Sequence, residues 1–362
     1  MNAPLLDPQV KSMPAKQIDP RRYFESIGEE RTPVAAEDPV CLYLEVTNRC
    51  NLLCTTCPRT FEELEPPSDM SWELFTSIVD QFPKIERVVL HGVGEPMMVA
   101  ELPKMVRFLK ERGVYVLFNT NGTLMREKKS RELIEAGLDE MRISLDAAEP
   151  KAFEAVRGRD VFDRIVRNIR NFVALKNRMG AMKPRLSLWL TGLRETLEQL
   201  PAFIRLAHGM SVMEVHLQRL VYFESKQCGL ARPESSLFEQ HDREEGKYLL
   251  DAEKLAAELG VFFDASGAVD PETSLRPSGG DTPWSLCRRP WSLMYFTAHG
   301  RALPCCIAPF SMRGYQSFTL GDARTTPLRE VWNSQEYRAF REALLSDNPP
   351  APCRGCGLRW SL

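Results

Sequence analysis

Strand-like and helix-like segments alternate regularly between residues 41 and 220 of this 362-residue chain. Short runs rich in valine, isoleucine, leucine and aromatic residues predict six strands, at Cys41–Thr47, Glu86–Gly92, Tyr115–Asn121, Glu140–Asp146, Arg185–Thr191 and Met213–Leu220. Helical spacing predicts the helices between them, at Trp72–Gln81, Leu102–Arg112, Glu127–Ala136, Lys151–Met179 with a break near Gly158, and Thr196–Ala207. Right-handed crossovers between such strands build a parallel sheet covered by helices. Six units are too few to close an eight-stranded barrel, so we expect an α/β fold with a partial (β/α)6 TIM-like barrel. Its functional site should lie at the carboxyl ends of the strands.

The rest of the chain divides into an extension, a connecting region and a small C-terminal domain. Residues 1–38 contain five prolines and no clear periodicity, which predicts an N-terminal extension before a barrel at residues 39–240. Residues 241–283 contain an expected helix at Lys247–Leu259 and a linker at Pro271–Pro283. Residues 284–362 then form the expected C-terminal domain.

The composition excludes several classes of partner. The formal net charge is −2, which provides no broad basic surface for nucleic acid or for an anionic membrane. No apolar run approaches the roughly 20 residues that span a bilayer, and the polar N-terminus lacks the apolar core of a secretory signal. We therefore expect a cytoplasmic protein that binds neither nucleic acid nor a membrane.

Ten cysteines in a chain without an export signal favour metal or redox chemistry over disulfides. Cys50, Cys54 and Cys57 form a C-x3-C-x2-C run directly after the first predicted strand. Three thiolates on such a loop can bind three irons of a [4Fe–4S] cluster and leave the fourth iron open to a small molecule. A structural zinc site is the alternative, but zinc sites usually contain C-x2-C pairs, and no histidine lies within thirty residues of this run.

The cysteine run resembles the motif of the radical S-adenosylmethionine (SAM) superfamily, in which SAM chelates the open iron. Three later segments resemble further family motifs in the same order: His91–Pro96 after the second strand, Asn119–Gly122 after the third, and Arg142–Asp146 at the fourth. Phe153–Gly158 resembles the family's Val-Arg-Gly helix segment. The resemblance implies that SAM is bound by Gly92, Gly94, Glu95, Asn121, Ser144 and Arg157.

Two of these positions have structural alternatives. Arg157 suits the carboxylate of SAM because a guanidinium binds carboxylates in a bidentate manner, but it could equally form a surface salt bridge. Asp146 is either a weaker candidate for the SAM site or the cap of the following helix. Trp189, His216 and Gln218, from the fifth and sixth strands, could contact substrate or fill the barrel.

A second set of cysteines lies near the C-terminus. Cys287, Cys305, Cys353 and Cys356 resemble the SPASM/twitch extension of radical SAM enzymes, which holds auxiliary iron–sulfur clusters. The resemblance implies one fully ligated auxiliary [4Fe–4S] cluster that moves electrons. The further cysteines of a full SPASM pattern do not follow, so a second auxiliary cluster is not expected. A zinc ribbon is the alternative for these four residues.

The remaining cysteines are expected to be structural. Cys41 and Cys228 stand alone in the sequence, and Cys306 is left over beside Cys305. Because a free cysteine behaves as a small apolar side chain, we expect all three to pack in the interior. For Cys306 the alternative is a spare cluster ligand or a reactive thiol.

The resemblance implies a radical SAM oxidoreductase that reductively cleaves SAM to a 5′-deoxyadenosyl radical, which abstracts hydrogen from substrate. Flavodoxin or ferredoxin is the expected electron donor. The single auxiliary cluster is most similar to the twitch dehydrogenases, so we expect oxidation of a small polar or carbohydrate-like molecule with that cluster as electron acceptor. The alternative is a maturase that modifies a ribosomally made peptide or protein, although the extension is too short for the winged-helix leader-binding domain that many maturases carry. A non-catalytic electron carrier would need neither the open iron nor the glycine loop.

Overall fold

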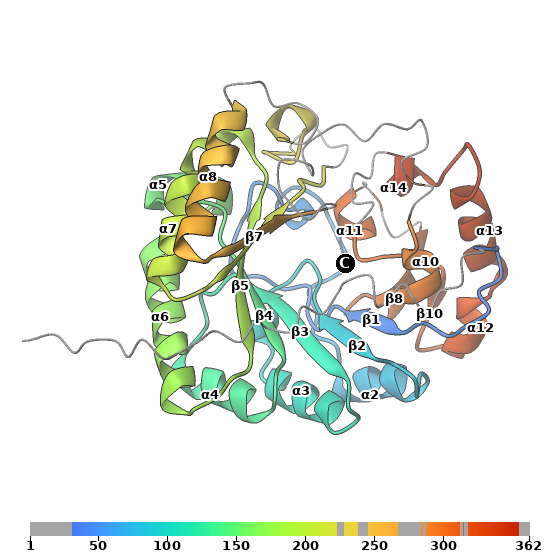
Figure 1. The fold of residues 1–362 in the computed structure, drawn as a ribbon. Helices are drawn as coiled ribbons and strands as arrows, with labels where there is room; N and C mark the ends of the chain where they lie inside the picture. Colours follow the sequence, from blue (N-terminus) through green and yellow to red (C-terminus); the bar gives the residue numbers. More distant parts are fainter. Residues whose placement is uncertain are drawn as a thin grey trace, which may run out of the picture.

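The computed structural model describes residues 31–222, 228–237, 245–266, 284, 287–311, 314 and 318–354. The strands among these residues form one curved sheet in the order β10-β9-β8-β1-β2-β3-β4-β5-β6-β7 (Figure 1). The sheet does not close on itself, because β10 and β7 are its two edges, and the expected partial barrel is therefore confirmed. Most of the expected N-terminal extension, the linker at Pro271–Pro283 and Cys356 lie outside the described residues.

Each of the six predicted strands is present. The parallel strands are β1 (Cys41–Leu44), β2 (Arg87–Leu90), β3 (Tyr115–Thr120), β4 (Glu140–Ser144), β5 (Arg185–Thr191), β6 (Glu214–Gln218) and β7 (Phe262–Ala265). The sequence analysis missed β7, which pairs with β6 and has only four residues. Phe262 is 44% exposed, so this strand lacks the continuous apolar run of a buried strand.

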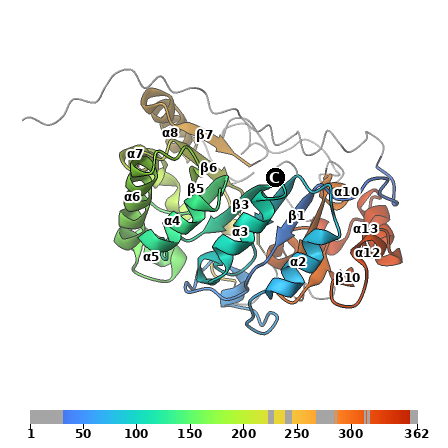
Figure 2. The ribbon, with the colours of Figure 1, turned by 90° about the horizontal axis from the view of Figure 1, so that it is seen from below.

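Helices lie on the outer side of the curved sheet (Figures 1 and 2). They are α2 (Trp72–Asp80), α3 (Leu102–Lys110), α4 (Glu127–Glu135), α5 (Pro150–Arg157), α6 (Phe162–Arg178), α7 (Leu200–Gly209) and α8 (Glu245–Leu259), with short 3-10 turns at Pro58–Thr60, Pro96–Met98, Arg194–Gln199 and Pro233–Ser235. Ser71 caps α2 by accepting a hydrogen bond from the Leu74 amide, and Gly158 ends α5 in a left-handed conformation. Within the part of the chain that the structure describes, no helix is both long and apolar enough to cross a membrane.

The C-terminal region extends the same sheet. It contains α10 (Arg289–Ser292), β8 (Leu293–Phe296), β9 (Arg301–Leu303), α11 (Ala308–Ser311), β10 (Gly321–Asp322), α12 (Leu328–Trp332), α13 (Gln335–Leu344) and α14 (Ala351–Arg354). Strand β8 pairs in parallel with β1, and α12 and α13 lie beyond that end of the sheet (Figure 1). The division into separate domains stays a prediction, because a boundary at residue 284 separates strands of a single sheet.

Alternate residues of the central strands face two different apolar regions. Leu42 and Leu44 of β1 belong to the large core between the sheet and its helices. Cys41 and Tyr43 belong to a smaller cluster on the other face of the sheet. Both faces of the central strands are therefore buried, and the polar side chains of the site gather where the strands end.

Candidate functional site

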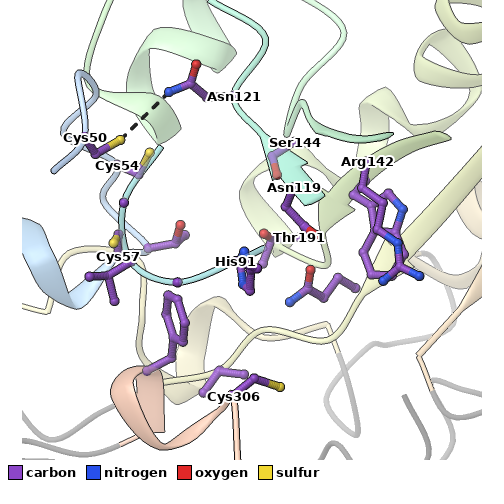
Figure 3. A pocket seen from close by; sticks show the side chains of 18 of the residues that line it. Cys50, Cys54, Cys57, His91, Asn119, Asn121, Arg142, Ser144, Thr191 and Cys306 are labelled. Carbon is purple, nitrogen blue, oxygen red and sulfur yellow. Dashed lines mark hydrogen bonds between the residues drawn. The ribbon is translucent and has the colours of Figure 1, made fainter. Parts of the chain in front are cut away.

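A cavity of about 220 Å³ lies at the carboxyl ends of the parallel strands (Figure 3). All the residues expected at the first cluster and at SAM line this cavity: Cys50, Cys54, Cys57, Gly92, Gly94, Glu95, Asn121, Ser144 and Arg157. These residues come from five segments of the chain, so the topology brings together what the sequence analysis predicted separately.

Glycines allow the cysteine loop to pack against its neighbours. A side chain at Gly94 would place Cβ 2.1 Å from the carbonyl oxygen of Thr47. A side chain at Gly158 would place Cβ 2.3 Å from the carbonyl oxygen of Leu53, and Gly158 also has a positive φ of 70°. The backbone of the cysteine loop thus packs directly against the loop after β2 and against the C-terminal end of α5.

Hydrogen-bond donors point at two of the three sulfur atoms. The Asn121 Nδ2 atom lies 3.8 Å from Cys50 Sγ, and the Arg157 Nη1 atom lies 3.7 Å from Cys54 Sγ. Burial, followed by the nearby cysteines, raises the pKa of the Cys57 thiol to about 12. These thiols ionise when bound iron supplies the opposing positive charge, as cluster ligands do.

The three thiols on one wall of the cavity form a donor set that suits an iron–sulfur cluster. Among the described residues, no three cysteine, histidine or carboxylate side chains converge closely enough to hold one metal ion. Cys50, Cys54 and Cys57 nevertheless line one side of the same cavity (Figure 3). Ligands of a [4Fe–4S] cluster each bind a different iron, whereas ligands of zinc share one ion. The three cysteines therefore fit the cluster that the sequence predicts.

Glu95 connects the loops after β2 and β3. Its Oε1 atom accepts hydrogen bonds from Thr120 Oγ1 at 2.7 Å and from the Met97 amide at 3.0 Å. Its Oε2 atom accepts one from the Asn121 amide at 2.6 Å. The side chain therefore fixes Asn121 beside the cysteine loop, and its predicted contact with SAM stays a prediction.

Glu45, which the sequence analysis missed, fixes the glycine-containing loop after β2 through hydrogen bonds. Its carboxylate accepts hydrogen bonds from the Val93 amide at 2.9 Å, from Tyr295 Oη at 2.8 Å and from the Ala298 amide at 3.2 Å. Burial raises the pKa of Glu45 to about 7, although these hydrogen bonds oppose the rise. A carboxylate inside an otherwise apolar strand was the clue in the sequence.

Arg157 forms a buried ion pair and not a surface salt bridge. Its Nε atom lies 2.6 Å from Asp146 Oδ2, and the two side chains are 12% and 1% exposed. Asp146 does not cap the following helix, since its Oδ1 atom accepts a hydrogen bond from the Thr191 amide at 2.8 Å. Ser144, at the end of β4, also lines the cavity, and its hydroxyl makes no hydrogen bond with any described residue. A bound ligand is thus able to use it.

The sequence analysis left open whether three residues of β5 and β6 contact substrate or fill the barrel, and the structure separates them. Trp189 and Gln218 line the cavity. His216 stacks on Trp189 with ring centroids 3.9 Å apart and lies 2.7 Å from Asp264 through Nδ1 and Oδ1. His216 does not itself line the cavity, but it packs against Trp189, which does.

Several other residues line the cavity although the sequence analysis did not predict them as site residues. His91 stacks on Phe310 of α11 at 6.1 Å, which brings the C-terminal region over the cavity. Arg142 and Arg289 also line it. A charged residue within the apolar run of β4 was a usable clue for Arg142, whereas the contribution of α10 and α11 depends on tertiary packing.

The C-terminal cysteines are only partly described. Cys287, Cys305 and Cys353 are half-buried, and Cys356 lies outside the described residues. Cys287 and Cys353 pack against the large core, whereas Cys305 packs against the smaller cluster on the other face of the sheet. Their assignment to an auxiliary cluster stays a prediction.

The leftover cysteines differ in their surroundings. Cys41 is 2% exposed and packs in the interior as expected. Cys306 is also buried, but it lines the cavity (Figure 3). Cys228 is only half-buried.

Known proteins resemble this chain along most of its length. A protein from Pyrococcus furiosus named tungsten-containing aldehyde ferredoxin oxidoreductase cofactor-modifying protein is 26% identical over 88% of this chain and 87% of its own. The PqqA peptide cyclase of Gluconobacter oxydans is 25% identical over 88% of this chain and 82% of its own. The fold resembles Streptococcus suis SuiB bound to S-adenosylmethionine, with a TM-score of 0.64 and 16% identity over 89% of this chain and 71% of that one.

Two family models match the regions that hold the two cysteine sets. Residues 44–207 match the Radical SAM superfamily, and residues 287–357 match the iron-sulfur cluster-binding domain SPASM. These domains imply a SAM-binding [4Fe–4S] cluster, an auxiliary iron–sulfur cluster and SAM as cofactors. The chain belongs to the radical SAM superfamily and carries a C-terminal SPASM domain.

Proposed function

We propose that this chain is a radical SAM maturase that modifies a ribosomally made peptide or protein. The observation that carries the proposal is the similarity to the PqqA peptide cyclase, which extends over 88% of this chain and 82% of that protein. SuiB, whose fold is similar with a TM-score of 0.64, has also been solved bound to its precursor peptide SuiA. The PqqA peptide cyclase and SuiB thus favour the alternative from the sequence analysis over oxidation of a carbohydrate-like molecule.

The chain's own residues prepare the site in three ways. Cys50, Cys54 and Cys57 would hold the cluster, which in its reduced form would give one electron to SAM and so supply a 5′-deoxyadenosyl radical and methionine. Asn121 and Arg157 direct hydrogen-bond donors at the sulfur atoms that would hold the cluster. Glu45 and Glu95 fix the loops around it, and α11 brings Phe310 over the cavity. Such enclosure protects a reactive radical from water.

The auxiliary cluster belongs to the same proposal. Cys287, Cys305, Cys353 and Cys356 are its proposed ligands. A fully ligated cluster has no open iron for substrate, so it would move electrons and not bind the peptide.

The test uses anaerobically reconstituted protein, SAM, a reductant and any short peptides that are encoded beside its gene. We expect one peptide to change in mass and to stimulate formation of 5′-deoxyadenosine. The Cys54→Ala variant should give neither product, because it lacks one ligand of the SAM-binding cluster. If 5′-deoxyadenosine formation responds only to small molecules and no peptide changes mass, the maturase proposal is wrong.

A further inference from the structure

Arg142, in the middle of β4, lies across the cavity from the three cysteines of the N-terminal motif (Figure 3). The residue is only 8% exposed. A buried cation is costly unless an anion compensates it. The groups that face its guanidinium therefore indicate which ligand fits the cavity.

The guanidinium of Arg142 is held in a fixed orientation. Its Nε atom donates a hydrogen bond to Glu140 Oε1 at 2.5 Å. Its Cζ atom lies 4.3 Å from the ring centroid of Trp189, and Trp189 in turn stacks on His216. The Nη1 and Nη2 atoms make no hydrogen bond with any described residue. Two parallel donors are thus positioned at the cavity wall without a protein acceptor among the described residues.

Glu140 does not neutralise Arg142 by itself. The same carboxylate pairs with Arg185 at 2.9 Å and accepts a hydrogen bond from Tyr115 Oη at 2.9 Å. Burial alone would raise the pKa of Glu140, but Arg142, Arg185 and Arg87 hold that pKa well below its usual range. Arg142 therefore shares the carboxylate of Glu140 with other guanidinium groups, of which Arg185 also pairs with Glu214 at 3.1 Å.

The cavity wall offers few carboxylate groups to Arg142. Arg219 and Arg289 also line the cavity. Among the described lining residues Glu95 is the one carboxylate, and both of its oxygens accept hydrogen bonds from the protein. Burial, followed by Arg142, lowers the pKa of His91 to about 4, so this imidazole is neutral near pH 7. Among the described lining residues, no carboxylate oxygen is therefore left for the guanidinium of Arg142.

We propose that Nη1 and Nη2 of Arg142 bind a carboxylate of the substrate. The planar fork of a guanidinium matches the two oxygens of a carboxylate, and charge-assisted pairs of this kind are among the stronger hydrogen bonds in proteins. The inference deepens the proposed function and rests on it, because it takes the carboxylate to belong to a peptide. The carboxylate is either an aspartate or glutamate side chain or a free C-terminus.

The experiment measures equilibrium binding to the reconstituted, SAM-bound holoenzyme by anaerobic calorimetry, without turnover. Four tripeptides serve as probes. Two are acetylated and amidated and differ only in a central glutamate or glutamine. The other two are acetylated trialanine with a free or an amidated C-terminus. We expect one acidic member of these two pairs to bind about tenfold or more tightly than its neutral partner, as for hydrogen bonds to charged groups. The pair that shows the preference identifies the source of the carboxylate.

Two variants assign the preference to Arg142. Arg142→Gln should remove this preference, and SAM binding, measured in the same way, shows whether the variant is folded. Arg185→Gln is the matched control, because Arg185 pairs with the same Glu140 but does not line the cavity. This control should keep the preference.

The proposal is overturned if neither acidic probe is preferred, or if Arg142→Gln keeps the preference. A loss of SAM binding in Arg142→Gln would also overturn it, because the arginine would then serve the cofactor. The outcome is distinguishable from failure of the maturase proposal. A protein that prefers acidic probes but changes no peptide would retain the carboxylate site and lose the proposed function.

Discussion

At the scale of single residues, buried charges connect the loops around the cavity to the stability of the fold. Arg157 and Asp146 form one such pair, and Glu45 is a buried carboxylate without a cation among its hydrogen-bond partners. The ion pair and Glu45 contribute to the stability of the fold for different reasons. An ion pair compensates both charges, whereas Glu45 is stabilised in its neutral form by burial.

Replacing Arg157 by Gln should lower the free energy of unfolding by about 3–5 kcal/mol, because the buried side chain of Asp146 would lose its partner. Denaturation with urea, using the anaerobically prepared protein, measures this change. The double variant with Asp146→Asn provides the control and should lose less than the sum of the two single variants. Additive losses would show that the pair is not coupled.

Glu45 should make stability depend on pH. Its pKa in the folded protein is about 7, above the ordinary value of 4.5, so the folded state holds the proton more tightly than the unfolded state does. This contribution to the unfolding free energy is complete below about pH 4.5 and is lost as pH rises through about 7. The wild-type unfolding free energy, minus that of Glu45→Gln, should therefore fall between pH 5 and pH 8 by about 3 kcal/mol at most. A difference that stays constant or rises with pH contradicts the assignment.

At the scale of secondary structure, the loops after the strands form the site, and glycines set how closely they approach. Gly94→Ala should lower stability by about 2 kcal/mol or more, because the new Cβ meets a backbone oxygen that cannot move away easily. Iron content after reconstitution should fall as well, since the displaced backbone belongs to the cysteine loop. Thermal unfolding and iron analysis measure both effects.

Gly209 provides the matched control at the end of α7. A Cβ there meets no atom within 4 Å, and its φ is not positive. Gly209→Ala should therefore be neutral or stabilising by about 0.5–1 kcal/mol. Equal losses in both variants would contradict the close backbone approach at Gly94.

The strands and helices of the barrel could be predicted because each carries its own local pattern. Short apolar runs marked β1 to β6, and Gly158 marked the break between α5 and α6. β7 was missed because it is short and half-exposed. The pairing of β8 with β1 joins residues about 250 positions apart, and no local pattern encodes such a contact.

The residues of the candidate site also differ in whether a local sequence pattern predicts them. The three cysteines and the Gly-Val-Gly-Glu-Pro loop were predictable as motifs at strand ends. Arg289 and Phe310 were not, because they reach the cavity only when the C-terminal region packs over it. For Glu45 the carboxylate in an apolar run was a usable clue, but its partner Tyr295 on β8 could not be predicted.

At the scale of the whole molecule, the two cysteine sets should hold separate clusters with separate tasks. Reconstituted protein should contain about eight irons, and Cys353→Ala about four. This variant should still cleave SAM with a chemical reductant but fail to complete substrate turnover. Iron analysis and quantification of 5′-deoxyadenosine test both statements.

Cys41→Ala is the control for the loss of a cysteine that binds no iron. Cys41 is buried in β1, so its replacement should cost about 1 kcal/mol of stability and leave the iron content unchanged. If Cys353→Ala keeps all its iron, or if it loses SAM cleavage, the separation of the two clusters is wrong.

The most direct test of the account is electron paramagnetic resonance of the reduced protein, recorded anaerobically before and after SAM is added. The account predicts a [4Fe–4S] signal that depends on Cys50, Cys54 and Cys57 and that changes when SAM binds the open iron. An absent signal, or one that SAM leaves unchanged, would contradict it.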